Sequence, residues 1–545
     1  MNDTPGWVTE ETPDLYGAYP RLEDYQIVAL TAVGQRRRFV KGQTLQRAGE
    51  PADEFLVVLE GRVLVLQDNG SAPHVIGVHG ARRFLGDLGL LTGQPSFLTS
   101  VTEDAGQLLA IPVEKLREVV SRDAGLADLM LRAFLVRRSL QLTLGAGFAI
   151  IGSRYSADTR RLRDFAARNR LPHQWIDLEN DTDAERLLRE LGVDRAQTPV
   201  VLWRGEVLRN PDNEQLAELV GLRPASPPRS VCDLIVVGAG PAGLAAAVYG
   251  ASEGLATVVV DSVATGGQAG TSSRIENYLG FPTGISGSEL ADRAVVQCKR
   301  FGAELVVPAG ACGLGHQDGQ HVVRLEGGEK VCGRAVVIAS GVHYRRLELS
   351  GLETVEPTSV YYAATEFEAN LCQGDPVVVV GGGNSAGQAA VFLSQYAGQV
   401  TLVVRSNDLG RDMSRYLADR IEGIDRIRVL VHSEARAVRG QGVLEEVVAE
   451  DLGSGERHSL PAKALFVFIG SVPHVRWLGQ QIELDDHGYV RTGPQLGPGC
   501  RLLETSRPGI FAAGDIRSGS VKRVAAAVGD GALAVRLVHE YLAGS

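Results

Sequence analysis

The chain has 545 residues, too many for a single hydrophobic core, and the usual size of a domain predicts roughly three or four of them. Its formal net charge of −10 excludes a broad nucleic-acid-binding surface, which requires a basic face. Residues 1–20 are acidic without an apolar core, and no segment approaches the ~20 apolar residues of a membrane span. We therefore expect a cytoplasmic protein with no secretory signal and no membrane anchor.

Proline and glycine divide the chain into blocks. The polar, proline-rich stretch 224–230 has the composition of a linker, and a weaker break falls at 145–147. We therefore predict blocks at 1–145, 146–224 and 230–545.

The first block contains short β segments separated by glycine turns. Residues 55–59 and 62–66 flank Glu60-Gly61, which predicts a tight hairpin, and residues 126–142 have helical periodicity. The run 40–66 resembles the opening strands of a cyclic-nucleotide-binding β-roll, so we expect that fold for residues 1–145.

The ligand site of this β-roll departs from the family pattern. In that family a short helix cradles the cyclic phosphate, an arginine pairs with it, and an acid holds the ribose. Residues 84–91 supply the turn, with Asp87 at the position of the acid, but residues 95–101 contain no cation where the arginine is expected. Two alternatives stay open: a roll that binds a nucleotide-like ligand, and a structural or differently liganded roll.

The second block alternates predicted strands, at 148–152, 173–178 and 200–204, with helices. This order resembles the thioredoxin/glutaredoxin fold, in which a threonine–cis-proline pair, here Thr198-Pro199, precedes an edge strand. Ser153 and Ser156 stand where the redox dithiol of that family belongs. A serine hydroxyl forms no accessible thiolate and cannot exchange disulfides. We predict a redox-silent scaffold, with docking of a partner or peptide as the alternative.

The third block opens with a dinucleotide-binding pattern. An apolar strand runs into Gly238, Gly240 and Gly243 of a GxGxxG turn, then into a helix, and the next strand ends at Asp261. The glycines allow a pyrophosphate to approach the helix N-terminus, and an acid at that position holds ribose hydroxyls. This pattern predicts an FAD site.

A second copy of the pattern begins at residue 375. The strand 377–380 runs into Gly381, Gly383 and a helix, with Ala386 in place of the last glycine, and the following strand ends at Arg405. An arginine there accommodates the 2′-phosphate of NADPH, so the second copy is predicted to bind NADPH.

Further motifs of the third block resemble those of low-molecular-weight thioredoxin reductases. In chain order they match the loop beside the isoalloxazine ring, the crossover between dinucleotide domains, the strand whose aspartate binds the ribityl chain, and the helix start under the ring. The matching residues are 266–269, 275–278, 280–282, 339–341, 509–515 and 522–529. The resemblance implies an NAD(P)H domain at 344–477 inserted into an FAD domain at 230–343 and 478–545.

The two patterns and the resemblance together give the candidate cofactor residues. For FAD they are Gly238, Gly240, Pro241, Ala242, Gly243, Asp261, Gly267, Gln268, Asn277, Gly341, Gly514, Asp515, Val524 and Ala525. For NADPH they are Gly381, Gly383, Asn384, Ser385, Ala386 and Arg405. No metal ligands and no catalytic side chain are predicted.

The family's redox dithiol is missing. Its two cysteine positions align with Tyr362 and Thr365, with Glu366 at the following acid, and Cys372 is nearby but single. None of the six cysteines forms a CxxC pair or has zinc-ligand spacing. The protein is therefore not expected to pass electrons by disulfide exchange.

The sequence predicts a multidomain α/β plus β protein: an N-terminal β-roll, a central thioredoxin-like fold without CxxC, and a C-terminal pair of Rossmann-like FAD and NAD(P)H domains. We expect an FAD-dependent oxidoreductase that passes hydride from NADPH to FAD and on to an unknown acceptor. The alternatives are a redox or nucleotide sensor and a thioredoxin-disulfide reductase. The resemblance also implies a homodimer.

Overall fold

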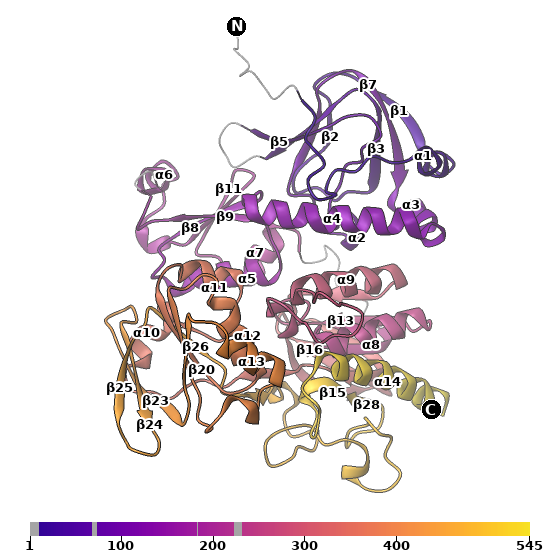
Figure 1. Ribbon diagram of the computed structural model, residues 1–545. Coiled ribbons are helices and arrows are strands. Elements are labelled where there is room, and N and C mark those ends of the chain that lie inside the picture. Colours follow the sequence, from indigo (N-terminus) through magenta and orange to yellow (C-terminus); the bar gives the residue numbers. More distant parts are fainter. Residues whose placement is uncertain (1–9, 68–72, 182–183, 223–230, 545) are drawn as a thin grey trace. The chain divides into compact units, whose positions relative to one another are not determined.

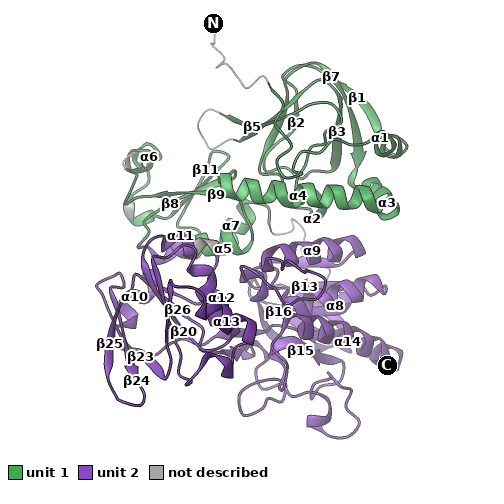
Figure 2. Ribbon diagram, viewed as in Figure 1, with its two compact units in different colours: residues 1–154, 161–226 green, residues 155–160, 227–545 purple. Residues whose placement is uncertain are grey.

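The computed structural model describes residues 10–67, 73–181, 184–222 and 231–544 (Figure 1). They form compact units, the first made of Met1–Arg154 with Arg161–Ser226 and the second of Tyr155–Arg160 with Pro227–Ser545 (Figure 2). The predicted linker, 224–230, lies outside the described residues. In the part of the chain that the structure describes, every helix is too short or too polar to cross a bilayer.

The β-roll of the first unit consists of antiparallel strands in facing sheets. The order in one sheet is β1 (Gln35–Phe39), β7 (Gly106–Pro112), β3 (Glu54–Glu60). The order in the other is β2 (Thr44–Gln46), β6 (Thr99–Thr102), β4 (Val63–Gln67), β5 (His74–His79). Alternate residues of these strands point into a shared apolar core that includes Phe39, Val58, Val63 and Leu108.

The predicted hairpin at Glu60-Gly61 is wrong. Strand β3 pairs with β7, whereas β4 pairs with β5 and β6, so the chain changes sheets at this point. A tight two-residue hairpin needs positive φ at its first turn residue, in type II′, or at both turn residues, in type I′. Here only Gly61 has it (φ 84°) and Glu60 stays in the strand, so the chain makes a corner between sheets.

The long helix α4 (Ala124–Leu144) is fixed to the roll by a buried arginine. The Arg137 guanidinium donates to the carbonyl oxygens of Ala18 (2.7 Å), Gly86 (2.6 Å) and Phe84 (3.1 Å), and lies over the Phe84 ring. Burial lowers the pKa of Arg137 to about 10, which leaves it charged at neutral pH. The single Arg137 cation therefore bonds to three carbonyl oxygens, and these bonds attach α4 to the β-roll.

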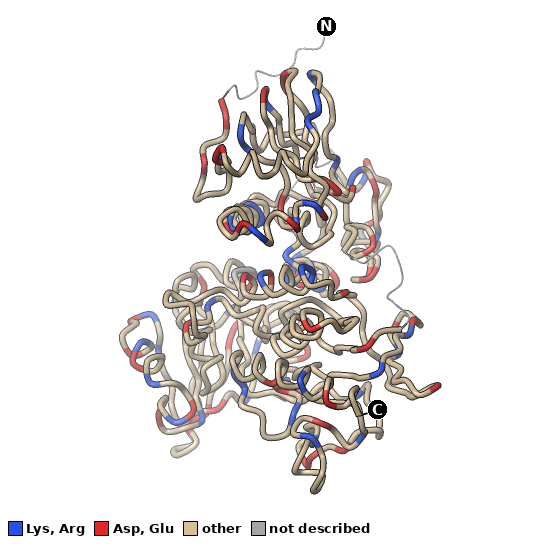
Figure 3. The backbone as a smooth tube through the Cα atoms, turned by 90° about the vertical axis from the view of Figure 1, so that its right-hand side faces the viewer, with Lys and Arg blue, Asp and Glu red and all other residues tan. Residues whose placement is uncertain are grey.

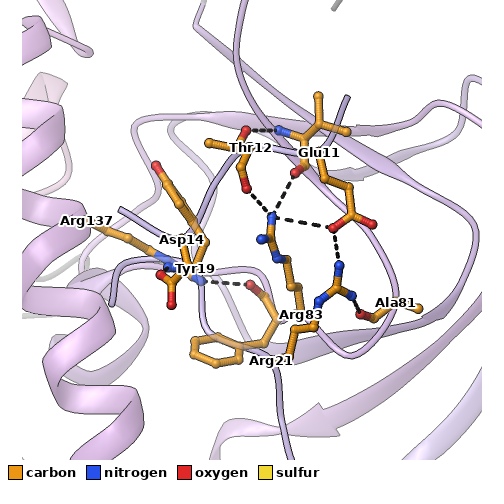
Figure 4. A network of polar contacts seen from close by, with 10 residues as sticks. Glu11, Thr12, Asp14, Tyr19, Arg21, Ala81, Arg83 and Arg137 are labelled. Atoms are coloured by element: carbon orange, nitrogen blue, oxygen red, sulfur yellow. Dashed lines mark hydrogen bonds and ion pairs between the residues drawn. The ribbon is translucent and has the colours of Figure 1, made fainter. Parts of the chain in front are cut away.

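A network of arginines fastens the N-terminal segment to the same roll (Figure 4). Arg21 pairs with Glu11 at 2.5 Å and also donates to the carbonyl oxygen of Ala81, while Arg83 donates to the carbonyl oxygen of Thr12 at 2.6 Å. The backbone N–H and the side-chain hydroxyl of Thr12 each form a hydrogen bond with the backbone of β5. The segment before α1 (Asp24–Thr31) is thus an integral part of the roll.

The remainder of the first unit is a mixed sheet with helices. Its strand order is β11 (Glu206–Arg209), β10 (Val200–Trp203), β8 (Phe148–Gly152), β9 (His173–Asp177), with β8 and β9 parallel and the other pairs antiparallel. Its helices are α5 (Ala157–Arg168), α6 (Ala184–Glu190) and α7 (Asn213–Leu219). The Thr198–Pro199 peptide bond, directly before β10, is cis.

The second unit contains one large sheet around a parallel centre. The order is β14 (Glu304–Val306), β13 (Thr257–Val260), β12 (Val231–Val237), β17 (Lys330–Ile338), β16 (Gln320–Leu325), β15 (Ala311–Gln317), and β28 (Ile510–Ala512) also pairs with β17. Helices α8 (Pro241–Ser252), α9 (Gly287–Phe301) and α14 (Val524–Ala543) share an apolar core with this sheet. The central strands β12 and β17 end in buried apolar runs, at 234–237 and 335–338, as expected where both faces of a parallel sheet are covered.

A smaller parallel sheet follows the same plan. Its order is β19 (Val360–Tyr361), β26 (Ala464–Val467), β20 (Pro376–Val380), β21 (Gln399–Val403), β22 (Ile427–Leu430). Helices α12 (Asn384–Leu393) and α13 (Arg415–Glu422) pack on it, and a meander of β23 (Ser433–Arg439), β24 (Glu446–Asp451) and β25 (Arg457–Pro461) lies beside it. The chain passes from the larger sheet to the smaller one through β18 (Val342–Tyr344) and returns to the larger sheet after β27 (Ser471–Pro473). These strands pair with each other.

Charged residues are mixed in both units. Figure 3 shows blue and red segments interspersed along the backbone. The excess of acidic residues over the whole chain, with a net charge of −10, is therefore spread over the molecule instead of forming a single acidic domain.

Candidate functional site

The first glycine turn connects β12 to α8 and is shaped by close contacts. A Cβ at Gly238 (φ 108°) would lie 2.2 Å from the carbonyl oxygen of Ala339, and one at Gly243 would lie 1.8 Å from the carbonyl oxygen of Gly238. Gly240, the N-cap of α8, differs: the nearest atom to its Cβ would be the Cα of Gly267, at 3.8 Å. The outer glycines therefore pack the turn, while Gly240 leaves open space at the helix N-terminus.

Pro241 and Ala242 continue this arrangement into α8. Pro241 occupies the first helical position, where a missing N–H costs nothing, and Ala242 is buried beside Gly514, whose Cβ would lie 2.9 Å from its own. The first turn of α8 thus has free backbone N–H groups and a partial positive charge facing the space at Gly240.

Asp261 follows β13 and fixes the backbone of the turn. Its Oδ2 accepts from the Ala239 N–H at 2.8 Å, and its Oδ1 accepts from Val263 and Ala264 at 2.9 and 3.2 Å. A carboxylate has about four acceptor sites, so it can still accept from ribose hydroxyls. Asp261 therefore has a structural role that the sequence pattern did not indicate, in addition to the predicted one.

Gly267 and Gln268 bring a second loop against this turn. A Cβ at Gly267 would lie 2.9 Å from the Cα of Gly240, and the Gln268 amide donates to the carbonyl oxygen of Val342, next to Gly341. The predicted crossover and the predicted flavin loop therefore meet at the turn. Asn277 is exposed on a loop closed by backbone hydrogen bonds between Ile275 and Ile285, at 2.7 and 3.1 Å.

Asp515 comes from the far end of the second unit. It follows β28, and the N–H of its neighbour Gly514 donates to Asp530 at 3.1 Å. Burial raises the pKa of Asp515, and Lys522 acts in the opposite direction. Among the described residues none hydrogen-bonds the Asp515 carboxylate, so it can accept from a ligand hydroxyl.

The start of α14 provides donors on the same side of the sheet. The N–H groups of Val524 and Ala525 lie in the first turn of the helix and have no intrahelical acceptors. The N-cap residue Arg523 makes no side-chain capping bond to them. An open cradle at Gly240, an unpartnered carboxylate at Asp515 and free amides at α14 fit a dinucleotide with a ribityl chain, as FAD has.

The second glycine turn, between β20 and α12, repeats the first with one change. A Cβ at Gly381 would lie 2.4 Å from the carbonyl oxygen of Phe468, whereas at Gly383, the N-cap of α12, it would lie 3.9 Å from the nearest atom. Ala386 is fully buried at the position of the third glycine, and Ser385 is exposed. The turn again leaves space for a phosphate group at a helix N-terminus.

Asn384 and Arg405 flank this space in different ways. The Asn384 Oδ1 accepts from the N–H (2.7 Å) and hydroxyl (2.9 Å) of Ser414, so its carbonyl holds the chain in place. Arg405 follows β21 with a side chain 77% exposed, and its closest acid is Glu434 at 4.0 Å. Glu434 pairs more closely with Arg436, at 3.0 Å, which leaves Arg405 available to a phosphate.

The residues that the sequence resemblance aligns with the family's dithiol, Tyr362 and Thr365, form hydrogen bonds within the protein. The Tyr362 hydroxyl donates to Glu356 at 2.8 Å, and burial together with Glu356 raises the Tyr362 pKa to about 12. The Thr365 N–H donates to Glu368 at 2.8 Å, at the start of α11 (Glu366–Leu371). Burial raises the pKa of Cys372 to about 12, so its thiol is neutral at physiological pH and a poor nucleophile.

Ser153 of the first unit and Ser156, in the short segment Tyr155–Arg160 of the second unit, are likewise engaged. Ser153 donates to Glu179 at 2.6 Å, and the Ser156 hydroxyl accepts from the Thr159 N–H at 3.2 Å at the start of α5. Both hydroxyls therefore stabilise the turn between β8 and α5.

The predicted ligand site of the β-roll, residues 84–91 and 95–101, is called the cassette below. It lies beside an arginine that the sequence pattern did not locate. Ser96 stands in the region where the family arginine belongs, and its hydroxyl donates to the Leu98 carbonyl oxygen. Arg138, from α4, approaches Asp87 instead, at 3.7 Å, and both side chains are over 90% buried. Among the described residues, Arg138 Nε and Nη2 and Asp87 Oδ2 have no hydrogen-bond partner. No local motif marks Arg138, because it comes from a helix about 40 residues beyond the cassette.

We expect Gly240→Ala to weaken FAD binding without unfolding the protein. Its φ of −74° suits alanine and the added methyl meets no close neighbour, but it fills the space at the N-terminus of α8. Loss of one phosphate-facing amide contact should weaken binding about 10- to 100-fold. The ratio of flavin to protein after purification and FAD titration measures this.

The matched control is Gly544→Ala, at the C-terminal end of α14, where a Cβ would meet only backbone oxygens of the same helix at 3.7 and 3.9 Å. Gly544→Ala should retain FAD at the wild-type level. An FAD affinity of Gly240→Ala equal to that of the wild type would contradict this assignment of the open space.

Comparison with known proteins identifies two regions. Residues 232–531 match the family described as pyridine nucleotide-disulphide oxidoreductase, and residues 36–123 match the cyclic nucleotide-binding domain. The family match in the second unit covers both glycine turns and Asp515.

Individual relatives agree. The "34.2 kDa protein in rubredoxin operon" of Clostridium pasteurianum is 32% identical over 57% of this chain and 97% of its own length. The thioredoxin reductase of Treponema pallidum is 34% identical, again over 57% and 97%. Among solved structures, thioredoxin reductases of Lactococcus lactis (25% identity, 58% of this chain and 100% of that chain) and T. acidophilum (27%, 57% and 99%) both have a TM-score of 0.54.

The cofactor pair follows from this kinship and from the fit of the turns. FAD suits the first turn with Asp261 and Asp515, and NADPH suits the second with Arg405. The chain belongs to the pyridine nucleotide-disulphide oxidoreductase family, and it is a thioredoxin reductase-like, FAD-dependent NAD(P)H oxidoreductase.

Proposed function

We propose that the protein transfers a hydride from NADPH to FAD and delivers the electrons to an external acceptor without a protein dithiol. The observation that carries this proposal is the state of the dithiol positions, where Tyr362 and Thr365 are bound to Glu356 and Glu368. Bound FAD itself supplies hydride acceptance and onward electron transfer, which need no protein sulfur.

The chain's residues bind and orient in this proposal. The N-termini of α8 and α12 present free amides to the pyrophosphates, and Asp261 and Asp515 accept from hydroxyls. Arg405 pairs with the 2′-phosphate. Each contact restricts a flexible dinucleotide to one position, which reduces the entropic cost of bringing two rings together.

The acceptor is external to the chain in this proposal. Acceptors that suit a site without a dithiol are a ferredoxin-like or other protein carrier, a quinone, or oxygen. Reduction of thioredoxin, the activity named for several relatives, requires a thiol relay, and the buried Cys372 offers no second sulfur. A redox or nucleotide sensor is the remaining alternative. Close packing at both glycine turns favours the enzyme, because a sensor needs only one nucleotide-binding turn.

For the first unit we infer structural roles. Strand order β11-β10-β8-β9 and a cis-proline before β10 support a thioredoxin-like fold for residues 146–222, with Ser153 and Ser156 making it redox-silent. Docking of a peptide or partner stays the alternative for that block, and the homodimer stays a prediction.

The β-roll is proposed to serve as a scaffold instead of a cyclic-nucleotide receptor. Arg138 faces Asp87 from within the fold, and it also donates to the Arg170 carbonyl oxygen at 3.2 Å. Beyond the cassette, Phe97 packs against Trp203 with ring centroids 5.5 Å apart. The cassette is thus covered by residues of its own unit.

The central experiment replaces all six cysteines by serine or alanine and mixes the yellow protein anaerobically with NADPH. Bleaching of the flavin should occur at a rate within about twofold of the wild type, because hydride transfer to the flavin needs no sulfur and all six cysteines lie outside both glycine turns. The wild-type protein, with its six cysteines intact, should likewise not reduce a disulfide reporter through thioredoxin. If Cys372→Ser alone abolished bleaching while FAD stayed bound, the thiol-free route would be wrong.

Arg405→Ala should weaken NADPH and leave NADH nearly unchanged. Because the side chain is 77% exposed, we expect the loss to be about three- to tenfold in the Kd for NADPH. Glu434→Gln should act in the opposite direction by removing a nearby negative charge. Equal losses for both nucleotides in Arg405→Ala would show that Arg405 does not face the 2′-phosphate.

Cyclic AMP should not stabilise the protein. At about 1 mM, a ligand with a Kd of about 10 µM would stabilise the folded state by about 2.7 kcal/mol, which a thermal melt detects readily. We expect no shift in Tm beyond the shift given by AMP at the same concentration. A shift specific to cyclic AMP would restore the receptor interpretation of the roll.

A further inference from the structure

Helix α13 links the NADPH turn to the flavin loop in the second unit. At its start, Ser414 is held by Asn384, the first residue of α12 in the second glycine turn, through two hydrogen bonds of 2.7 and 2.9 Å. In its last turn, Arg420 pairs with Glu276 at 3.2 Å. Glu276 directly precedes Asn277 in the loop assigned to the isoalloxazine side.

The helix between these ends is firmly packed. A Cβ at Gly387 of α12 would lie 2.7 Å from the Met413 sulfur and 2.8 Å from a Leu417 methyl carbon, so the helices are in close contact. Leu417 and Ile421 are almost completely buried. A short rigid helix therefore transmits the position of one turn to Arg420.

The ion pair joins the larger and the smaller sheet of the second unit, which the paired strands β18 and β27 also connect. Strands of this length form a flexible connection, so contacts beyond them contribute to how the sheets face each other. The side chains of Arg420 and Glu276 are 44% and 30% exposed, which makes the pair weak but available. Arg274, on the same loop, lies 3.7 Å from Glu276 and competes for it.

We propose that Arg420 and Glu276 are positioning residues that hold the NAD(P)H-binding turn in register with the flavin loop for hydride transfer. This inference rests on the proposed transfer from NADPH to FAD. Neither side chain touches the reacting atoms; the pair instead raises the population of the arrangement in which the rings meet.

The kinetic test measures flavin bleaching at saturating NADPH in Arg420→Ala, Glu276→Ala and the double variant. Each single change should lower the limiting rate about two- to fivefold, and the double variant should be no slower than the slower single variant. The Kd for NADPH should stay within about twofold, since the binding contacts remain. Raising the salt from about 50 to about 500 mM should slow the wild type and not Arg420→Ala.

The matched control is Arg415→Ala on the same helix. Arg415 is 93% exposed and pairs with Asp419 within α13 at 3.8 Å, so its removal takes away the same charge without touching Glu276. Its limiting rate should equal that of the wild type.

A second readout does not depend on activity. Hydrogen exchange of α13 and of the loop 274–285, measured in the protein without nicotinamide, should accelerate in Arg420→Ala and Glu276→Ala alike and stay unchanged in Arg415→Ala. Wild-type rates and exchange in both variants would overturn this inference. A wild-type flavin that NADPH does not reduce would overturn the proposed function instead, which separates the two failures.

Discussion

The second unit depends on how closely helix α8 can approach its neighbours. A side chain at Gly243 would collide with the backbone of Gly238, and one at Gly531 of α14 would lie 2.2 Å from the carbonyl oxygen of Ala242. Only hydrogen fits at these positions, so strand, turn and two helices contact through their backbones. This places the N-terminus of α8 beside Asp515 and the start of α14, which come from nearly 300 residues away.

Close packing at one position and open space at the next are complementary. Neighbouring backbone approaches closely at Gly238, Gly243 and Gly381, whereas Gly240 and Gly383 are left clear. In the second turn the position of the third glycine is taken by the buried methyl group of Ala386. A phosphate-sized space therefore arises from backbone geometry, and the few side chains around it, Asp515 and Arg405 among them, determine which dinucleotide it suits.

The sequence was informative wherever a local pattern has a physical cause. Period and glycine spacing identified both glycine turns, the strand that leads into each and the strand that follows, and the absence of any CxxC pair led to the prediction of a route without a dithiol. Local patterns failed at the corner after Glu60, where the strands continue into different sheets. They also gave no indication of Arg138 beside Asp87 or Arg420 beside Glu276, because these pairs join residues distant in sequence whose meeting depends on the assembled fold.

The pairing of β28 with β17 has a consequence for how the protein is made. More than 170 residues separate the end of β17 from the start of β28, and the intervening chain builds the smaller sheet before it returns. During synthesis the smaller sheet can fold as soon as its residues leave the ribosome. The larger sheet cannot be completed until its last parallel strand, β28, has been made and α14 has packed against α8. Until then residues 336–338 of β17 lack a partner on one side, because β16 pairs only with residues 330–333 on that edge, and the apolar face of α8 is exposed. The nascent chain is therefore most prone to aggregation during the interval in which half of its dinucleotide machinery is already folded.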